Sequence, residues 1–362
     1  MSEHPSSVAV VGAGYVGLVT AACLAERGHT VEVIESDSAR LGALRRGHVP
    51  FHEPGLEALL QRGIAGERLR IHGELAGPLR HARIAIIAVG TPILADGSPD
   101  LSGIERLAAD IASGAHPGTI VAIKSTVPPG TAACLRRLLD RGPSSVRLVS
   151  SPEFLREGAA IEDFMAPARL VVGGEDAEAL TEVAALIAAP GTPIVRTDHD
   201  TAELIKYASN AFLGLKISFV NELSLLCEQL QGDVREVTRG MGLDPRIGSE
   251  FLQAGIGFGG SCLGKDLRTL ARIAEDAGSP HTLVSGALEV NEQRLLGFVE
   301  AVHASLRDCG PAPRAAVLGL SFKPETDDIR ESRGVALAQE LLRRGITVSV
   351  HDPRAMDNAT GM

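Results

Sequence analysis

Residues 8–35 read VAVVGAGYVGLVTAACLAERGHTVEVIE, and this stretch decides the fold of the first half of the chain. It opens with a short apolar β-type run, which three closely spaced glycines follow at once. A helical pattern then continues to about Arg27, and Gly28 ends it. A second apolar run ends at Glu35. A strand, a glycine turn, a helix and a strand in this order are the context that a dinucleotide-binding fingerprint requires.

The three glycines of this turn have separate roles in a dinucleotide site. Gly12 permits the tight turn, Gly14 lets a pyrophosphate approach, and Gly17 lets helix and strand pack closely. The pyrophosphate then lies at the helix N-terminus, on unsatisfied N–H groups and the positive end of the helix dipole. Glu35 is placed to accept hydrogen bonds from the ribose hydroxyls, and its charge would repel a 2′-phosphate. The pattern therefore predicts NAD rather than NADP.

Three further apolar runs each end in a polar, turn-rich segment, and they cover residues 84–89, 119–124 and 147–149. Continuous apolar strands that alternate with helices predict an α/β fold with a Rossmann-type parallel sheet, covered on both faces. Ligands of such sheets bind beyond the carboxyl ends of the strands. We therefore expect four residues near the cofactor: Thr91, Thr126, Glu153 and Glu157.

The pattern becomes helical after Asp200. One long stretch without proline covers about residues 202–231, and more helix follows to about Leu306. Lys206 and Asn210 are four residues apart, so they share one face of the long helix. Apolar neighbours indicate that Lys206 is a partly buried cation at a site rather than a solvated lysine. The same helix is a candidate homodimer interface.

An α/β pattern returns near the end of the chain, with a strand over 316–320, a helix over 334–343 and a strand over 347–350. This is one mononucleotide-type unit, and the chain stops at Met362. We therefore expect an exposed sheet edge and an incomplete core there. The sequence predicts three domains, which cover residues 1–200, 201–308 and 314–362.

The stretch Gly259-Gly260-Ser261-Cys262-Leu263-Gly264-Lys265-Asp266 places one cysteine among glycines, close to a lysine and an aspartate. The thiolate is the reactive form of cysteine, and nearby cations favour it. Together with a hydride acceptor, such a thiol indicates oxidation through a covalent thio-intermediate. The alternative is a buried cysteine that packs as a small apolar side chain.

Composition narrows the possible functions. The net charge of −10 argues against a nucleic-acid surface or an acidic membrane surface. The five cysteines are scattered, so neither a disulfide framework nor a metal site is expected. The short polar N-terminus resembles no signal peptide, and no apolar run has membrane-spanning length. A cytoplasmic protein is expected.

Several separated motifs, in order, resemble the UDP-glucose/GDP-mannose dehydrogenase family over essentially the whole chain. They are residues 12–17, Glu53-Pro54-Gly55-Leu56, Gly90-Thr91-Pro92, 125–130, 151–158, Lys206 with Asn210, Asn221-Glu222, 257–266 and 321–332. The segments 322–332 and 244–248 are more similar to the UDP-glucose branch than to the GDP-mannose branch. The resemblance implies that the last domain binds a nucleotide sugar.

The resemblance also implies a reaction, the four-electron oxidation of the sugar C6 alcohol to a carboxylate with two NAD⁺. UDP-glucose is the expected substrate and UDP-glucuronate the product. Cys262 would capture the aldehyde as a thiohemiacetal, which is oxidised to a thioester and then hydrolysed. Lys206 and Asn210 would stabilise the oxyanions. Asp266, and Thr126 through a water molecule, would assist proton transfer, with Glu153 near the hydrolytic water.

The implied binding residues form two overlapping sets. The cofactor set is Gly12, Gly14, Tyr15, Val16, Gly17, Glu35, Arg40, Thr91, Thr126, Glu157, Lys265 and Arg330. The substrate set is Glu153, Phe154, Leu155, Glu157, Lys206, Asn210, Arg246, Phe258, Gly259 and Lys323. Lys265, Arg246, Lys323 and Arg330 would offer positive charge to the phosphates of the UDP or the cofactor.

The chain departs from the family pattern at two places. Gly264 stands where proline is usual, which predicts a looser cysteine loop, and the C-terminal domain ends after its second strand. Three other functions are open. They are oxidation of another nucleotide sugar (a UDP-N-acetylhexosamine or GDP-mannose), a two-electron oxidation of the β-hydroxyacid dehydrogenase kind, and binding of NAD or a nucleotide sugar without catalysis.

Overall fold

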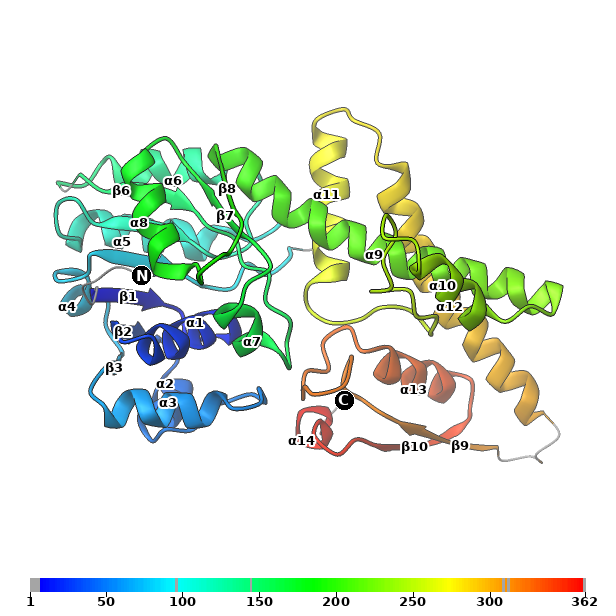
Figure 1. The fold of residues 1–362 in the computed structure, drawn as a ribbon. Coiled ribbons are helices and arrows are strands. Elements are labelled where there is room, and N and C mark those ends of the chain that lie inside the picture. Colours follow the sequence, from blue (N-terminus) through cyan, green and yellow to red (C-terminus); the bar gives the residue numbers. More distant parts are fainter. Residues whose placement is uncertain (1–6, 95–96, 144, 308–309, 311–312, 361–362) are drawn as a thin grey trace. The chain divides into compact units, whose positions relative to one another are not determined.

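A computed structural model describes residues 7–94, 97–143, 145–307, 310 and 313–360. The chain forms two compact units, Met1–Lys206 and Tyr207–Met362, and each is described by itself. Figure 1 shows the elements of both.

The first unit is built on a sheet of eight strands in the order β3-β2-β1-β4-β5-β6-β7-β8. The strands are β1 Ser7–Val11, β2 Thr30–Ile34, β3 Leu69–His72, β4 Ile84–Ile87, β5 Ile120–Ile123, β6 Arg147–Ser150, β7 Leu170–Gly173 and β8 Ile194–Thr197. Val8 pairs with Val31 of β2 on one side and with Ile84 of β4 on the other, both in parallel. This is the expected Rossmann-type arrangement, with β1 in the interior of the sheet.

Two strands that the sequence did not identify, β7 and β8, extend the predicted parallel sheet in a different direction. β7 runs antiparallel to β6, joined at Ser150 and Gly173, and β8 runs parallel to β7. The physical reason lies in the connection after β6. Its helix α7, Ala160–Met165, has six residues, about 9 Å, which is short for a crossover to the opposite edge. The chain therefore enters β7 from the edge where β6 ended.

Alternate residues of the central strands enter two different cores. Val8 and Val10 of β1 pack in one apolar cluster, while Ala9 and Val11 pack in the other. Continuous apolar strands are the consequence of burial on both faces, as the sequence predicted. Helices cover both faces in Figure 1. One cluster includes residues from α1 Tyr15–Glu26, α2 Ser38–Arg45, α3 Leu56–Ala65, α7 and α8 Ala177–Ile187; the other includes residues from α4 Ala76–Leu79, α5 Ser102–Gly114 and α6 Thr131–Leu139.

The second unit contains most of the long helix α9, His199–Leu230, which begins in the first unit. Further helices are α10 Val234–Gly242, α11 Leu263–Asp276 and α12 Thr282–Leu306. The expected second βαβ motif follows as β9 Arg314–Leu318, α13 Arg333–Arg343 and β10 Thr347–His351, with the strands parallel, and the short α14 Met356–Ala359 comes last. β9 ends two residues before the predicted Leu320, because Gly319 has a φ of 106° that breaks the strand.

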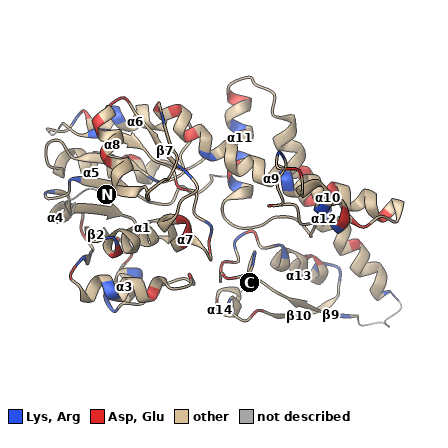
Figure 2. Ribbon diagram, in the orientation of Figure 1, with Lys and Arg blue, Asp and Glu red and all other residues tan. Residues whose placement is uncertain are grey.

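Charge is mixed over both units. Figure 2 shows Lys and Arg interspersed with Asp and Glu along the same elements. Of the helices within the described ranges, none has the length and apolar character needed to cross a membrane.

Candidate active site

The glycine turn between β1 and α1 has room for a phosphate group. A Cβ on Gly12 would lie 2.6 Å from the carbonyl oxygen of Ala88, and a Cβ on Gly17 would collide with the Gly12 carbonyl. Gly14, by contrast, faces open space among the described residues, and it precedes α1 without a side chain that caps the helix. The first N–H groups of α1 are thus available to an anion. The turn fits the pyrophosphate of NAD, with Tyr15 and Val16 as the first residues of the helix.

Glu35 lies directly after β2 and is almost fully buried. Its carboxylate accepts hydrogen bonds from the amides of Ala13 (3.3 Å) and Asp37 (2.8 Å), and it pairs with Arg40 at 3.0 Å. The structure thus joins two predicted cofactor residues, Glu35 and Arg40, to the glycine turn. Their roles toward a ribose stay predictions.

The loops after β4 and β5 also meet. The Thr91 hydroxyl donates to the Thr126 carbonyl at 2.8 Å, so these two predicted residues lie together at the carboxyl edge of the sheet.

A buried charge cluster follows β5 and β6. The Lys206 ammonium is 2.9 Å from a carboxylate oxygen of Glu153, and the two residues are only 4% and 7% exposed. Burial raises the pKa of Glu153, but the charge and hydrogen bond of Lys206, with the Leu155 amide and Lys124, outweigh it and hold this pKa below its usual value. Lys206 is therefore a buried, paired cation, more deeply enclosed than the sequence predicted.

Lys124 is the second cation of this cluster, and sequence analysis missed it. It is 3% exposed at the end of β5, and burial, opposed by the charge of Glu153, lowers its pKa to about 8. A lysine that ends a fully apolar strand was the available signal. Phe154, a predicted substrate residue, lies beside the cluster, with the Arg169 guanidinium 3.8 Å and the Lys206 ammonium 5.5 Å from its ring centre.

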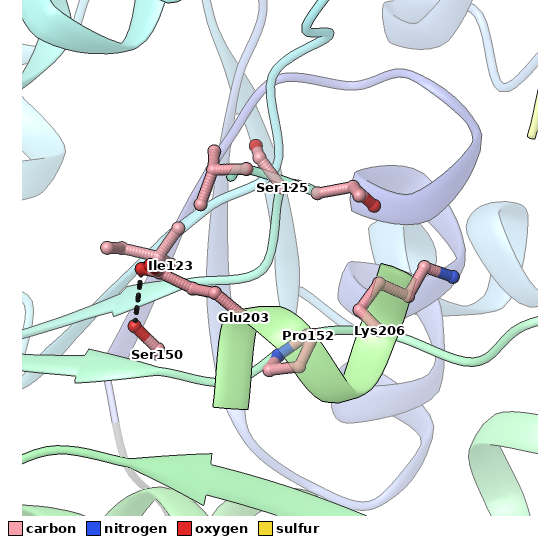
Figure 3. A pocket seen from close by; sticks show the side chains of 8 residues that line it. Ile123, Ser125, Ser150, Pro152, Glu203 and Lys206 are labelled. Carbon is pink, nitrogen blue, oxygen red and sulfur yellow. Dashed lines mark hydrogen bonds between the residues drawn. The ribbon is translucent and has the colours of Figure 1, made fainter. Parts of the chain in front are cut away.

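A small cavity adjoins the charge cluster (Figure 3), and it is lined by the last residues of β5 and β6, the loops that follow them, and α9. The lining residues are Ile123, Ser125, Thr126, Val127, Ser150, Pro152, Glu203 and Lys206. Glu203 was also missed. One of its carboxylate oxygens accepts from the Ser150 hydroxyl at 3.1 Å, and burial raises its pKa to about 8. In Figure 3 the Glu203 carboxyl and the Lys206 amine point in opposite directions from α9.

Cys262 occupies the residue before α11 and is exposed. The sulfur lies 3.6 Å from the Ser261 hydroxyl. A helix N-terminus favours a thiolate over a thiol, because the helix dipole is positive there. The alternative of a buried, packing cysteine is therefore wrong for Cys262. It fits Cys23, which is buried and whose pKa burial raises to about 12, whereas Cys309 lies outside the described residues.

The structure gathers three predicted residues one turn beyond Cys262. The Asp266 carboxylate is buried, accepts a hydrogen bond from the Asn210 side-chain amide at 2.6 Å, and pairs with the Lys265 ammonium at 2.7 Å. The Asp266 amide donates to the Cys262 carbonyl at 2.9 Å. The thiol, an amide donor, a cation and a carboxylate therefore share one end of α11.

Gly264 does not loosen a loop, which corrects the expectation from the sequence. It is buried in the first turn of α11, and a Cβ there would collide with the carboxylate of Glu331. The preceding segment is also fixed, since the Phe258 carbonyl accepts from Arg333 (2.8 Å) and the Gly260 amide donates to the Arg330 carbonyl (3.0 Å).

The other predicted cations, Arg246, Lys323 and Arg330, make different contacts from those of Lys265. The Arg330 and Arg246 guanidinium groups are exposed, and each pairs with an aspartate two residues earlier. The Lys323 ammonium lies 5.5 Å from the centre of the Phe322 ring, whose edge packs against Gly260. A phosphate role for these three stays a prediction.

Three family models match the chain in order. They are the NAD binding domain of the UDP-glucose/GDP-mannose dehydrogenase family over residues 6–190, its central domain over 200–293 and its UDP binding domain over 316–362. This chain belongs to the UDP-glucose/GDP-mannose dehydrogenase family. The predictions of the family, of the mixed α/β fold and of an NAD-dependent oxidoreductase are thereby confirmed.

Individual members of the dehydrogenase family are similar over nearly the whole chain. A UDP-glucose 6-dehydrogenase of Rhizobium meliloti is 43% identical over 360 residues, which are 97% of this chain and 82% of the relative. A solved UDP-glucose dehydrogenase of Pyrobaculum islandicum has 40% identity and a TM-score of 0.95, and covers 99% of this chain and 84% of that one. A UDP-D-ManNAc dehydrogenase of Pyrococcus horikoshii has 28% identity and a TM-score of 0.86, covering 96% and 83%.

Proposed function

We propose that this chain oxidises UDP-glucose at C6 to UDP-glucuronate with NAD⁺, through a thioester on Cys262. The observation that carries the proposal is the exposed cysteine at the N-terminus of α11, in a chain with an NAD-binding domain. A two-electron dehydrogenase needs no such thiol. The likeness to UDP-glucose dehydrogenases, higher in identity and in TM-score than the likeness to the UDP-D-ManNAc enzyme, supports glucose as the sugar.

The glycine turn and Glu35 would hold NAD⁺, which would supply the hydride acceptor, one molecule for each of the two oxidation steps. The Cys262 thiolate adds to the C6 aldehyde and forms a C–S bond as the carbonyl bond opens. Lys206 and Asn210 stabilise the resulting oxyanion as fixed donors. Water later adds to the thioester carbon, the C–S bond breaks, and Cys262 leaves as thiolate. Asp266, and Thr126 through water, hold the transferred protons.

Glu153 serves this chemistry by fixing the Lys206 ammonium. A buried ammonium without a partner tends to lose its proton, since burial disfavours the charged form. The 2.9 Å contact to Glu153 places a carboxylate against the Lys206 ammonium and restricts its rotation. Phe154, Leu155 and Glu157 extend the same loop toward the nucleotide sugar in this proposal.

The proposed assembly is a homodimer through α9. Its large apolar side chains Phe212, Phe219, Leu226 and Leu230 are exposed at spacings of seven, seven and four residues. Such spacing places them along one face of the helix, and exposed apolar stripes mark interaction surfaces. The cytoplasmic location expected from the sequence stays a prediction.

Product stoichiometry tests the proposed reaction. The purified chain, NAD⁺ and UDP-glucose should give two NADH per uronate formed. One NADH per substrate would contradict the thioester route, and faster turnover of GDP-mannose or a UDP-N-acetylhexosamine would contradict the choice of sugar. Cys262→Ser should bind both ligands and lose uronate production by at least 100-fold, because its hydroxyl is a far weaker nucleophile. Cys227→Ser is the matched control and should keep normal turnover.

A further inference from the structure

Glu53 belongs to the Glu53-Pro54-Gly55-Leu56 motif, and the proposed mechanism does not use it. It lies just before α3, where Gly55 has a φ of 80° and precedes the helix. Its carboxylate is buried, with the residue only 6% exposed. A buried carboxylate needs hydrogen-bond donors, because an unpaired one carries a large desolvation penalty.

The donors come from two segments far away in the sequence. The Tyr15 hydroxyl donates to one carboxylate oxygen of Glu53. The Gly158 amide donates to the same oxygen at 2.6 Å, and the Ala160 amide donates to the other at 2.9 Å. The Gly158 amide is also 2.9 Å from the Tyr15 hydroxyl. One carboxylate therefore ties residue 15 to residues 158–160 of the same unit.

Each tied segment adjoins a different ligand in the proposed reaction. Tyr15 is the first residue of α1, directly after Gly14 in the turn that fits the pyrophosphate. Gly158 ends the loop that begins after β6 and carries Glu153, Phe154 and Leu155. Gly158 has a φ of 82°, a conformation that favours glycine and leaves this amide directed at Glu53.

The state of the tyrosine supports a donor role. Burial first, and then the hydrogen bond to Glu53, raise the pKa of the Tyr15 hydroxyl above its usual value. The hydroxyl therefore keeps its proton near neutral pH and donates it to the carboxylate. Tyr15 is further enclosed by Phe51, whose ring centre is 5.1 Å away.

We propose that Glu53 is a positioning residue that couples cofactor binding to nucleotide-sugar binding, by tying the pyrophosphate turn to the substrate loop. The inference rests on the proposed function, since it takes the loop at residues 153–158 as the sugar site. A phosphate on the first amides of α1 restrains Tyr15, and through Glu53 it orders the Gly158 end of the loop. By thermodynamic linkage, each ligand then raises the affinity of the chain for the other by the same factor.

Binding of NADH measures this coupling without turnover, because a reduced cofactor cannot accept a hydride from UDP-glucose. Fluorescence titrations give the Kd of NADH with and without saturating UDP-glucose, and calorimetry gives the Kd of UDP-glucose alone. In the unmodified chain, saturating UDP-glucose should lower the Kd of NADH by about 5-fold or more. In Glu53→Gln this factor should fall to about 1, because a neutral amide has one acceptor oxygen for the three donors.

Two further variants keep the test clear if Glu53→Gln folds poorly. Tyr15→Phe removes one hydroxyl and should lower the coupling factor in the same direction, and the double variant should lose no more than Glu53→Gln alone. The matched control is Glu57→Gln, on the exposed face of α3, which should keep the full factor.

The outcomes separate this inference from the proposed reaction. Equal weakening of both ligands in Glu53→Gln, with the coupling factor unchanged, would make Glu53 purely structural and overturn the inference. Binding of both ligands to the unmodified chain without any coupling would overturn it as well, leaving the proposed function intact. Failure of UDP-glucose to bind the unmodified chain would overturn the proposed function and the inference together.

Discussion

Lys124, Glu153 and Lys206 form one buried charge cluster. They are far apart in the sequence, so the sequence does not indicate that they lie together. Lys206 pairs directly with Glu153. Lys124 interacts with the same carboxylate only through its charge, and this does not offset the effect of burial on the Lys124 pKa. Its pKa of about 8 means that a sizeable part of the Lys124 population is neutral under mildly alkaline conditions. Lys206, which the proposed reaction uses, belongs to the same cluster. A change in the charge of Lys124 would change the electrostatic environment of the Lys206 ammonium.

Glu203 makes the stability of the first unit depend on pH. Its pKa is raised by burial to about 8, whereas an unfolded glutamate titrates near 4.3. Between these values the folded chain holds a proton that the unfolded chain has released, so stability falls as the pH rises through this window. The slope from this residue approaches about 1.4 kcal/mol per pH unit.

Glu203→Gln should abolish this dependence, because an amide does not titrate. Its melting temperature should match that of the unmodified chain near pH 5 and exceed it by several degrees near pH 8. Differential scanning calorimetry at both pH values checks this. Parallel melting curves for the two proteins across the window would show that Glu203 ionises normally.

At the residue scale, sequence reasoning succeeds where chemistry is tied to a local pattern. The glycine turn, Glu35 and the Cys262-to-Asp266 stretch are local, and the structure keeps each group in a compact arrangement. Lys124 and Glu203 escaped because their burial depends on which strands and helices pack around them. The apolar strand before Lys124 was a sign of its burial, whereas nothing in the residues that flank Glu203 distinguishes it from a solvated charge.

At the scale of elements, the turn after β10 fixes the small parallel sheet of the second unit. The Asp352 carboxylate accepts hydrogen bonds from the amides of Leu320 and Ser321 after β9, and from those of Arg354 and Ala355 in its own turn, at 2.7 to 2.9 Å. Burial raises the pKa of Asp352, but these amides outweigh it and hold the pKa below its usual value. One side chain therefore ties together the segments that follow both strands.

Asp352→Asn should lower the free energy of unfolding of the second unit by about 2–3 kcal/mol at pH 7, because one carboxylate oxygen becomes an amide donor facing other donors. The pKa of Asp352 is depressed on folding, so its stabilisation is present above about pH 4 and is lost as the pH falls further. Urea unfolding at pH 7 and pH 3 measures both effects. The exposed Asp357→Asn serves as control, and an equal loss there would refute the local explanation.

Elements with a clear apolar pattern were predicted closely, whereas two short strands were missed. The long helix predicted over residues 202–231 is α9, and the strand predicted over 347–350 is β10. β7 and β8 have four residues each and were not identified individually. Their direction is set by the short connection through α7 and by pairing with β6, neither of which has a periodic signature.

For the whole molecule, the exposed apolar face of α9 predicts assembly. Phe219→Asp places a charge in the middle of this face and should raise the Kd of the homodimer by at least 100-fold, because a charge loses its hydration in an apolar interface. Light scattering behind size exclusion, over a range of concentrations, reports the mass. Leu94→Asp, an equally exposed leucine of the first unit, should leave the mass unchanged. An unmodified chain that stays monomeric at 100 µM would contradict the dimer.

Cys262 is the exposed one among the four cysteines that the structure describes. Its sulfur is therefore the first that peroxide in a stored solution should reach, with sulfenic acid as the reversible product and sulfinic acid as the permanent one. The storage lifetime of the activity should therefore depend on oxidation of the Cys262 sulfur. Preparations kept under a thiol reductant should outlast those kept in air, and the loss of activity should follow the loss of one alkylatable group per chain.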